Sequence, residues 1–300
     1  MSIETVFFYT PNKIELTGII HKSDKKTNKI MIFVHGMSSN AIKYRSEVIA
    51  KDMNQIDIDF FAFNNRGHEL TSYYKKKVDG KTETKLGGSS YEDIFDSYDD
   101  ICGSINYAIS LGYTDIYLSG HSLGCTKILY MYNKLKENNE KSILNKIKAI
   151  ILLSLIDIQA VQKIYLNDKY DSTLEYAINK EKENKENELM PEKSFIHPIS
   201  VKTYLRYFKY NEEVSFPKYS DKNYEFKELN NIKVPLFMRW GTEKEMIIQK
   251  PNDLCELVKA NLSNKELDIS YIEGAPHGYS SKEKILSDQI VNFLCSKVIK

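Results

Sequence analysis

A serine flanked by two glycines is the first group in this sequence that could act as a nucleophile. The residues GHSLG stand at 120–124, directly after the apolar run 115–119 and at the start of a helical pattern over 123–135. A serine on a sharp strand-to-helix turn has a strained backbone, and glycines are needed beside it because a Cβ there would clash. Such a turn lifts the hydroxyl above the sheet and aims the helix N-terminus at a developing oxyanion. We therefore predict that Ser122 is a nucleophile.

A serine hydroxyl needs a base, and histidine suits that task near neutral pH. A neutral imidazole takes up the serine proton and later returns it to the leaving group. His277 lies in the stretch 274–278, directly after the apolar run 267–272 and before the last helical pattern. His21 and His197 have no such context. His277 is therefore the candidate base.

Short apolar runs that alternate with helical patterns indicate parallel strands joined by helices. Continuous apolar runs are typical of strands that are buried on both faces. The expected strands are residues 5–9, 16–21, 30–35, 58–64, 115–119, 147–154, 235–240 and 267–272. The expected helices include residues 40–53, 91–111, 123–135 and a last helix with an apolar stripe over 286–294. The pattern predicts an α/β protein with a mostly parallel sheet.

These features resemble the α/β-hydrolase superfamily, of the serine esterase or lipase type. In that superfamily a strand ends in His-Gly, as the apolar run 32–36 does here. The resemblance implies an α/β-hydrolase fold, with a doubly wound sheet of about eight strands. It also implies that His277 is the catalytic base and that the backbone amides of Met37 and Leu123 form the oxyanion hole. The chain order serine, acid, histidine is the one expected for this fold.

The superfamily places its catalytic acid after the penultimate strand, in a Gly-x-x-Asp pattern before aliphatic residues. Residues 241–248 read GTEKEMII, so Lys244 occupies the expected slot. Glu245, one place later, precedes the aliphatic residues as the family acid does, and we predict that it completes the triad. Glu243 and Asp157 stay open as alternatives, since some lipases carry the acid after the strand that precedes Asp157. The acid orients the imidazole and stabilises its cation.

Several short motifs are similar to a smaller group within the superfamily, which includes fungal siderophore esterases. The motifs are NRGH at 65–68, GCTK at 124–127, SLID at 154–157 and WG at 240–241. His68, in the first motif, is expected either near the site or in a surface loop.

One connection is much longer than the others. Between the expected strands 147–154 and 235–240, the chain far exceeds the usual connection of about 2–6 residues plus one helix. We interpret residues 157–231 as a cap inserted into a single domain that spans residues 1–300. Its aromatic residues, among them Tyr204, Tyr207 and Phe208, fit a sizeable, partly apolar substrate and equally fit ordinary packing.

The composition is typical of a globular protein that binds neither nucleic acid nor membranes. Hydrophobic residues make up 42% and charged residues 28%, and the net charge of +1 gives no basic excess to attract polyanions. The N-terminus lacks the pattern of a signal peptide, and four cysteines are scattered without a CxxC pair, so we expect a cytoplasmic protein with free thiols. No residues have metal-ligand spacing, and we expect neither a metal nor a cofactor. The oligomeric state is not indicated.

The expected reaction is hydrolysis of a small-molecule, ester-type substrate. Ser122 would attack the carbonyl carbon, and water would then release the acyl group from the enzyme. Two alternatives stay open. An acyltransferase or thioesterase would use the same triad, because the cap and the pocket choose the acceptor. A non-catalytic binding module with a hydrolase fold would not need an acid in the expected position, which Lys244 occupies here.

Overall fold

The structure is a computed structural model that describes residues 2–210, 214 and 217–299, and its strands form one mixed sheet of ten. The sheet order is β10-β9-β8-β7-β3-β4-β2-β5-β6, with β1 paired to β2. The strands paired in parallel are β3 (Lys29–Val34), β4 (Asp59–Asn64), β7 (Asp115–His121), β8 (Ile147–Leu153), β9 (Leu236–Glu243) and β10 (Leu267–Pro276). The antiparallel strands are β1 (Ser2–Tyr9), β2 (Ile14–Lys22), β5 (Ser72–Val78) and β6 (Lys81–Gly87).

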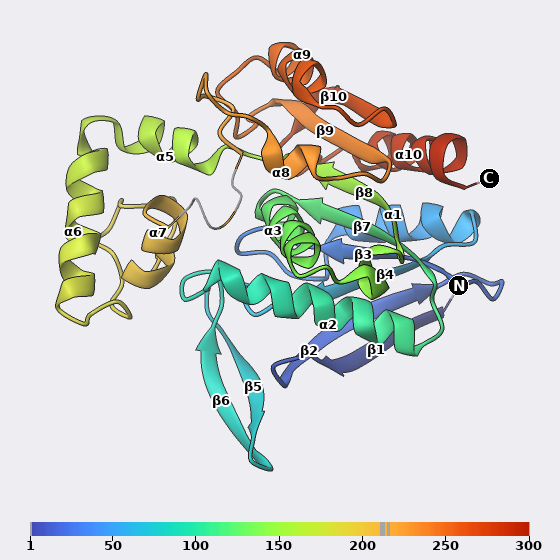
Figure 1. Cartoon of the computed structure of the whole chain (residues 1–300), viewed down its shortest axis with the longest axis horizontal. Coiled ribbons are helices and arrows are strands. Elements are labelled where there is room, and N and C mark those ends of the chain that lie inside the picture. The colour runs from blue at the N-terminus through green and yellow to red at the C-terminus, as the bar shows by residue number, and fades with distance from the viewer. Residues whose placement is uncertain (1, 211–213, 215–216, 300) are drawn as a thin grey trace.

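The ten strands correct the prediction of about eight. All eight expected strands are present, and the additional pair is the hairpin of β5 and β6, which projects from the rest of the sheet (Figure 1). The two strands read SYYKKKV and KTETKLG, and most of their side chains are exposed or half-buried. Because they contribute little to the core, no apolar run marks them in the sequence.

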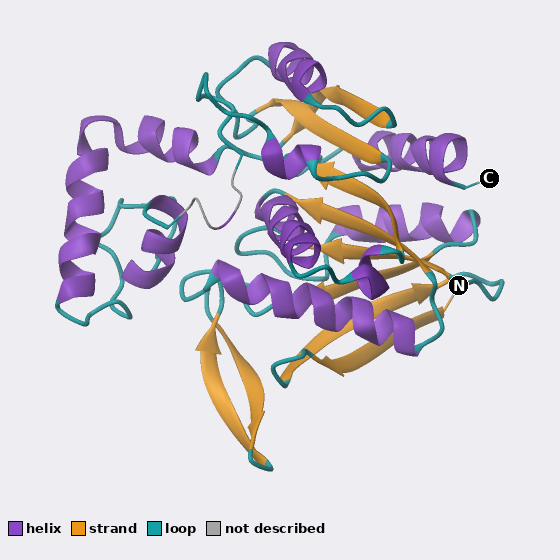
Figure 2. Cartoon of the chain, in the orientation of Figure 1, coloured by secondary structure: helices purple, strands orange, loops and turns teal. Residues whose placement is uncertain are grey.

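Helices cover both faces of the sheet (Figure 2). The helices of the main body are α1 (Tyr44–Gln55), η1 (Ile94–Asp96), α2 (Ser97–Ser110), α3 (Leu123–Glu137), α4 (Lys141–Leu144), α9 (Pro251–Asn261), α10 (Glu283–Phe293) and η4 (Leu294–Val298). Along β3 the side chains alternate between two cores. Ile30, Ile32 and Val34 belong to the core that α2, α3 and α9 cover, whereas Met31 and Phe33 belong to the core under α1 and α10. This period of two is what a strand buried on both faces produces.

The long segment between β8 and β9 folds into separate helices. They are α5 (Ile158–Leu166), η2 (Asn167–Lys169), α6 (Tyr170–Lys182), α7 (Val201–Phe208) and α8 (Lys227–Asn230). Helices α5, α6 and α7 lie beyond the carboxyl ends of β3, β7 and β8 (Figure 1). Their apolar side chains form a cluster of their own, which also contains Leu123 of α3. Residues 211–213 and 215–216 of the predicted insertion lie outside the described residues.

Two further sequence features can be compared with the structure. All four cysteines are free thiols, as their scattered positions predict. In the described part of the chain, no helix is both long enough and apolar enough to cross a membrane.

Candidate active site

Ser122 lies at the turn between strand β7 and helix α3. β7 ends at His121 and α3 begins at Leu123, so the serine is the single residue between the two elements. Its backbone angles are φ 54° and ψ −124°, a conformation that costs a non-glycine residue energy and persists only where the surrounding structure enforces it. The strained strand-to-helix turn predicted from the sequence is therefore present.

Gly120 and Gly124 permit the close packing of this turn. A Cβ on Gly124 would lie 2.2 Å from the carbonyl oxygen of Val34 on β3. A Cβ on Gly120 would lie 2.8 Å from the carbonyl oxygen of Gly124. Both contacts are with backbone atoms, which cannot move aside as a flexible side chain can. Both positions thus require glycine for Ser122 to reach the end of the sheet.

A cavity of about 580 Å³ opens in front of this turn. Ser122, which is 7% exposed, lines it together with His277, and so do the predicted oxyanion-hole residues Met37 and Leu123. Part of its wall is apolar and comes from Ile156, Ile158, Val161, Phe195, Ile196 and Met246. The structure therefore places the predicted nucleophile, base and oxyanion hole at one cavity.

The aromatic residues singled out in the long insertion serve packing instead. Tyr204, Tyr207 and Phe208 are buried in the apolar cluster of α5–α7 and do not line this cavity. Among the described residues of the insertion, the tyrosine and phenylalanine side chains that line the cavity are those of Tyr165 and Phe195.

His277 and Glu245 form a hydrogen bond between Nδ1 of the imidazole and Oε1 of the carboxylate. His277 directly follows β10, and Glu245 lies in the loop that follows β9. β9 and β10 are parallel neighbours, so their carboxyl ends lie at the same edge of the sheet. With Nδ1 bound to the carboxylate, Nε2 is the nitrogen that can serve a serine hydroxyl.

Glu245 is a buried carboxylate that several donors surround. Its side chain is 2% exposed. Oε2 accepts a hydrogen bond from the backbone N–H of Gly241 and from the hydroxyl of Ser154, each at 2.8 Å. Burial raises the pKa of Glu245, but the hydrogen bonds from His277, Gly241 and Ser154 outweigh burial and hold that pKa below its ordinary value. The carboxylate is therefore ionised at neutral pH and able to stabilise an imidazolium.

Ser154 and Tyr279 lie behind the carboxylate. Oγ of Ser154, which follows β8 with a φ of 54°, is 2.9 Å from the hydroxyl oxygen of Tyr279. The Tyr279 hydroxyl in turn lies 2.8 Å from the carbonyl oxygen of Arg239 on β9. We call Glu245, His277, Ser154 and Tyr279 the Glu245 cluster. The sequence did not predict Ser154 and Tyr279 as members of this cluster, because neither residue lies in a motif with a recognisable spacing to Glu245 or His277.

His121, the residue before the nucleophile, supports the loop of His277. Its Nε2 is 2.8 Å from the carbonyl oxygen of His277, and because a carbonyl can only accept, Nε2 carries the proton. Burial, and then the charge of Arg45, lower the pKa of His121 well below its ordinary value, so the ring stays neutral. His121 is thus a donor to the backbone beside the predicted base, a role that its place in the GHSLG motif does not reveal.

The two alternative acids lie elsewhere. Asp157 caps the N-terminus of α5: one of its oxygens accepts from the N–H of Ala160 and the other from the hydroxyl of Ser220. Glu243 is the last residue of β9 and is exposed. Among the described contacts, neither carboxylate is hydrogen-bonded to His277, so the geometry favours Glu245.

His35 stabilises the end of β3, just before Met37. Its Nδ1 is 2.9 Å from the carbonyl oxygen of Gly36, and its Nε2 accepts a hydrogen bond from the N–H of Asn65 at 3.3 Å. One ring nitrogen donates and the other accepts, which requires a neutral imidazole. Burial, and then the charge of Lys127, lower the pKa of His35 to about 3.

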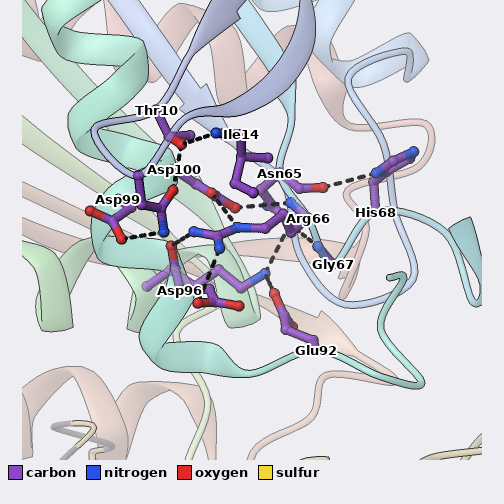
Figure 3. Close-up of polar contacts among 12 residues, drawn as sticks. Thr10, Ile14, Asn65, Arg66, Gly67, His68, Glu92, Asp96, Asp99 and Asp100 are labelled. Carbon is purple, nitrogen blue, oxygen red and sulfur yellow. Dashed lines mark hydrogen bonds and ion pairs between the residues drawn. The ribbon is translucent and has the colours of Figure 1, made fainter. Parts of the chain in front are cut away.

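A second buried polar cluster surrounds the motif NRGH (Figure 3). Arg66 pairs with Asp100 at 2.7 Å, and Lys127 pairs with Glu92 and also donates to the side-chain oxygen of Asn65 at 3.2 Å. We call these five residues the Arg66–Lys127 cluster. None of them lines the cavity of Ser122. The cluster links the loop after β4, helix α2 and helix α3.

His68 lies at the edge of this cluster (Figure 3). Its Nδ1 is 2.9 Å from the backbone carbonyl oxygen of Asn65, and it is not among the residues that line the cavity. Of the two expected positions, the structure thus places His68 in a loop and not in the wall of the cavity. Across the described residues, no group of three or more His, Cys, Asp or Glu side chains could hold a metal ion.

No family model matches the sequence, and no curated protein matches it. Solved structures match it along its whole length. The α/β hydrolase GrgF from Penicillium sp. sh18 is 16% identical with a TM-score of 0.67, and the match covers 100% of both chains. Est1E from Butyrivibrio proteoclasticus, with ferulic acid bound, is 15% identical with a TM-score of 0.65, over 98% of this chain and 100% of that one. DcsB in complex with its substrate analogue is also 15% identical with a TM-score of 0.65, over 100% of both chains.

Identities this low carry information about the fold alone. The matches agree with the sheet and helix arrangement described above, and with the sequence resemblance. The chain has the α/β-hydrolase fold.

Proposed function

We propose that this chain is a serine hydrolase that cleaves a carboxylic ester, with Ser122, His277 and Glu245 as its triad. The observation that carries the proposal is that the hydrogen-bonded pair of His277 and Glu245 adjoins the cavity that Ser122 lines. A nucleophile on a strained turn, an imidazole and a buried carboxylate are the three groups that acyl transfer requires. The likeness in fold to named esterases supports the same assignment.

In the proposed mechanism, Oγ of Ser122 attacks the ester carbonyl while Nε2 of His277 takes up its proton. Glu245 stabilises the imidazolium that results. The tetrahedral intermediate collapses, the C–O bond breaks, and His277 returns the proton to the leaving alcohol. A water molecule then attacks the acyl-enzyme by the same route, which releases the carboxylic acid and restores the hydroxyl of Ser122.

The oxyanion of the tetrahedral intermediate needs N–H donors, and we assign this role to the backbone amides of Met37 and Leu123. Leu123 is the first residue of α3, so its N–H has no acceptor within the helix, and the positive end of the helix dipole lies there. Met37 follows the His35-Gly36 pair and lines the same cavity. Together the two amides would stabilise the charge that develops in the transition state.

Residues 157–231 act, in this proposal, as a cap within a single domain that spans residues 1–300. Side chains from α5 and from the stretch 195–197 form part of the cavity wall, so the cap helps to choose the substrate. The structures of Est1E with ferulic acid and of DcsB with a substrate analogue favour a small-molecule ester as the ligand. Location in the cytoplasm and the closer resemblance to siderophore esterases remain predictions from the sequence.

A fluorophosphonate probe tests the nucleophile directly, because it labels only an activated serine. We expect the wild-type protein to be labelled and to hydrolyse short acyl esters. Ser122→Ala should abolish labelling and lower kcat by about 10⁴–10⁶ without unfolding the chain. Ser280→Ala, which changes another serine of the same cavity, should still be labelled.

The same experiment separates the alternatives. Near-normal hydrolysis by Ser122→Ala would contradict the proposal. Labelling without hydrolysis of oxygen esters would favour acyl transfer or thioester cleavage. Absence of labelling in the wild type would favour a binding module without activity.

A further inference from the structure

Arg45 lies at the cavity of Ser122 and has no role in the proposed triad. It is the second residue of α1, it is 7% exposed, and it lines the cavity together with Ser122 and His277. Its Nη1 donates a hydrogen bond of 3.0 Å to the carbonyl oxygen of Gly278, the residue that follows His277. The guanidinium is therefore adjacent to the loop that carries the base.

The charge of Arg45 is not neutralised by a carboxylate. Among the described residues, no aspartate or glutamate forms an ion pair with it, and its Nε is buried without a hydrogen-bond acceptor. The other three arginines of the chain differ in this respect. Arg66 pairs with Asp96 and Asp100, Arg206 with Asp93, and Arg239 with Asp268. The arginine at the cavity is thus the one that the described part of the protein leaves without a counter-ion.

A buried cation without a counter-ion is unfavourable unless another group compensates it. Burial lowers the pKa of Arg45 to about 10, so the side chain still carries its charge at neutral pH. The carbonyl of Gly278 and the face of the Phe33 ring, 5.6 Å from the guanidinium carbon, supply only partial negative charge. Glu283 also lines the cavity and attracts Arg45 electrostatically, but does not form an ion pair with it.

A second cation stands at the same end of the cavity. Lys43 is the N-cap of α1, is exposed, and lines the cavity. A lysine at this position is unfavourable for the helix itself, because the N-terminal end of the helix dipole is already positive. Lys43, Arg45 and the end of α1 together exceed the single negative charge of Glu283 at this cavity, whereas another part of the wall is apolar.

We propose that Arg45, assisted by Lys43, binds a carboxylate on the substrate, so that the preferred esters are anionic. This inference rests on the proposed ester hydrolysis at Ser122. Arg45 contacts the residue next to His277, and His277 returns the proton to the leaving alcohol. The carboxylate accordingly belongs to the alcohol part of the ester, and the acyl part lies against the apolar wall. The substrate class is an acyl ester of a hydroxy acid.

A matched pair of substrates tests the subsite: 3-butyryloxypropanoate and its carboxamide, which has nearly the same shape but no charge. The wild type should cleave the carboxylate with a kcat/KM about 10- to 100-fold higher, the range expected for a hydrogen bond to a charged group. Arg45→Gln should lower kcat/KM for the carboxylate about 10- to 100-fold more than for the carboxamide, mainly through KM. Arg45→Lys should keep part of the preference. Arg206→Gln, at an arginine that is paired elsewhere, should keep all of it.

Two results would overturn the subsite. If the wild type cleaves both substrates equally well, no anion is recognised, and this measurement does not depend on whether Arg45→Gln folds. If Arg45→Gln lowers kcat for both substrates to the same extent, Arg45 only holds the loop of Gly278 in place.

A binding measurement separates this inference from the proposed reaction. In the Ser122→Ala background, isothermal titration should show 3-butyryloxypropanoate binding about 10-fold or more tightly than the carboxamide, with the difference lost on adding Arg45→Gln. If the wild type hydrolyses neither ester and is not labelled by the fluorophosphonate, the proposed reaction fails, yet the titration still decides whether an anion binds at Arg45. Equal binding of the two compounds would exclude the subsite.

Discussion

Glu245 and Glu92 are both buried carboxylates with a basic partner. The partner of Glu245 lines the cavity of Ser122, and the partner of Glu92 does not. His277, the partner of Glu245, is 21% exposed and lines the cavity beside Ser122. Lys127, the partner of Glu92, is fully buried in the Arg66–Lys127 cluster. The His277 imidazole can therefore pass a proton to or from a molecule in the cavity, whereas Lys127 and Glu92 are buried away from it.

The difference shows that burial and charge pairing do not by themselves mark an active site. The Arg66–Lys127 cluster contains more charged side chains than the Glu245 cluster, and it joins three elements of the main body (Figure 3). It lacks a nucleophile and access for a substrate. We therefore expect changes in the Glu245 cluster to lower activity and changes in the Arg66–Lys127 cluster to lower stability.

Within these two clusters, the largest effect is expected at Glu245. Glu245→Gln should leave the fold intact but lower kcat by about 10⁴, because an amide favours the wrong tautomer of His277. Asp157→Asn and Glu243→Gln should change kcat little, since neither side chain is hydrogen-bonded to His277 among the described contacts. All three variants should be compared on one ester at one pH.

Two outcomes would change this assignment. A large loss confined to Asp157→Asn would move the triad to the earlier strand. Wild-type activity in all three variants would mean that His277 works as a dyad with Ser122, and that Glu245 contributes to stability only.

The next largest effect is expected at Lys127. Lys127→Met leaves the Glu92 carboxylate buried without its cation, which should lower the free energy of unfolding by about 3–5 kcal/mol. The double variant Lys127→Met/Glu92→Leu should recover much of this loss, because it removes both charges. Urea unfolding gives the stabilities, and kcat at a temperature where each variant is folded should stay within a few-fold of the wild type. A folded Lys127→Met protein with a 100-fold lower kcat would show that the cluster belongs to the site.

A smaller effect on stability is expected from His35, which adjoins the Arg66–Lys127 cluster through Asn65. The unfolded chain takes up a proton at this histidine below about pH 6.5, but the folded ring resists protonation until about pH 3. The unfolded state therefore binds more protons between these values, and stability falls as the pH falls, by up to about 1.4 kcal/mol per pH unit. Denaturant unfolding between pH 7 and pH 4 should show a steeper fall for the wild type than for His35→Gln. Equal slopes would contradict the assignment.

The smallest effect is expected at Ser154. Ser154→Ala removes one hydrogen bond to the Glu245 carboxylate and should lower kcat by about 10-fold. Ser154→Gly removes the same hydroxyl but suits the positive φ of this position, so it should be more stable than the alanine variant and equally slow. Wild-type kcat in both variants would show that the Ser154 hydroxyl does not support Glu245.

The fold was largely predictable because its central strands have a local signal. The parallel strands are buried on both faces, which forces continuous apolar runs into the sequence. The β5–β6 hairpin has no such constraint, since its side chains are mostly exposed, and its lysine-rich strands were not predicted. The length of the insertion after β8 is likewise visible in the sequence, but not the use of its aromatic residues. Tyr204 and Tyr207 pack inside the insertion, and Phe195 reaches the cavity.

The sequence by itself determined the turn at Ser122, because a nucleophile at a sharp turn needs glycines at fixed distances along the chain. It also located His277 and a short set of candidate acids. Only the tertiary structure decided which acid meets His277, since this depends on β9 and β10 being parallel neighbours whose ends lie together. Ser154, His121 and Arg45 come from other strands and helices, far apart in the sequence, and no local pattern connects them. The packing of strands and helices in three dimensions brings His121 and Arg45 to the cavity and Ser154 to the Glu245 carboxylate, and that is why the sequence alone could not name them.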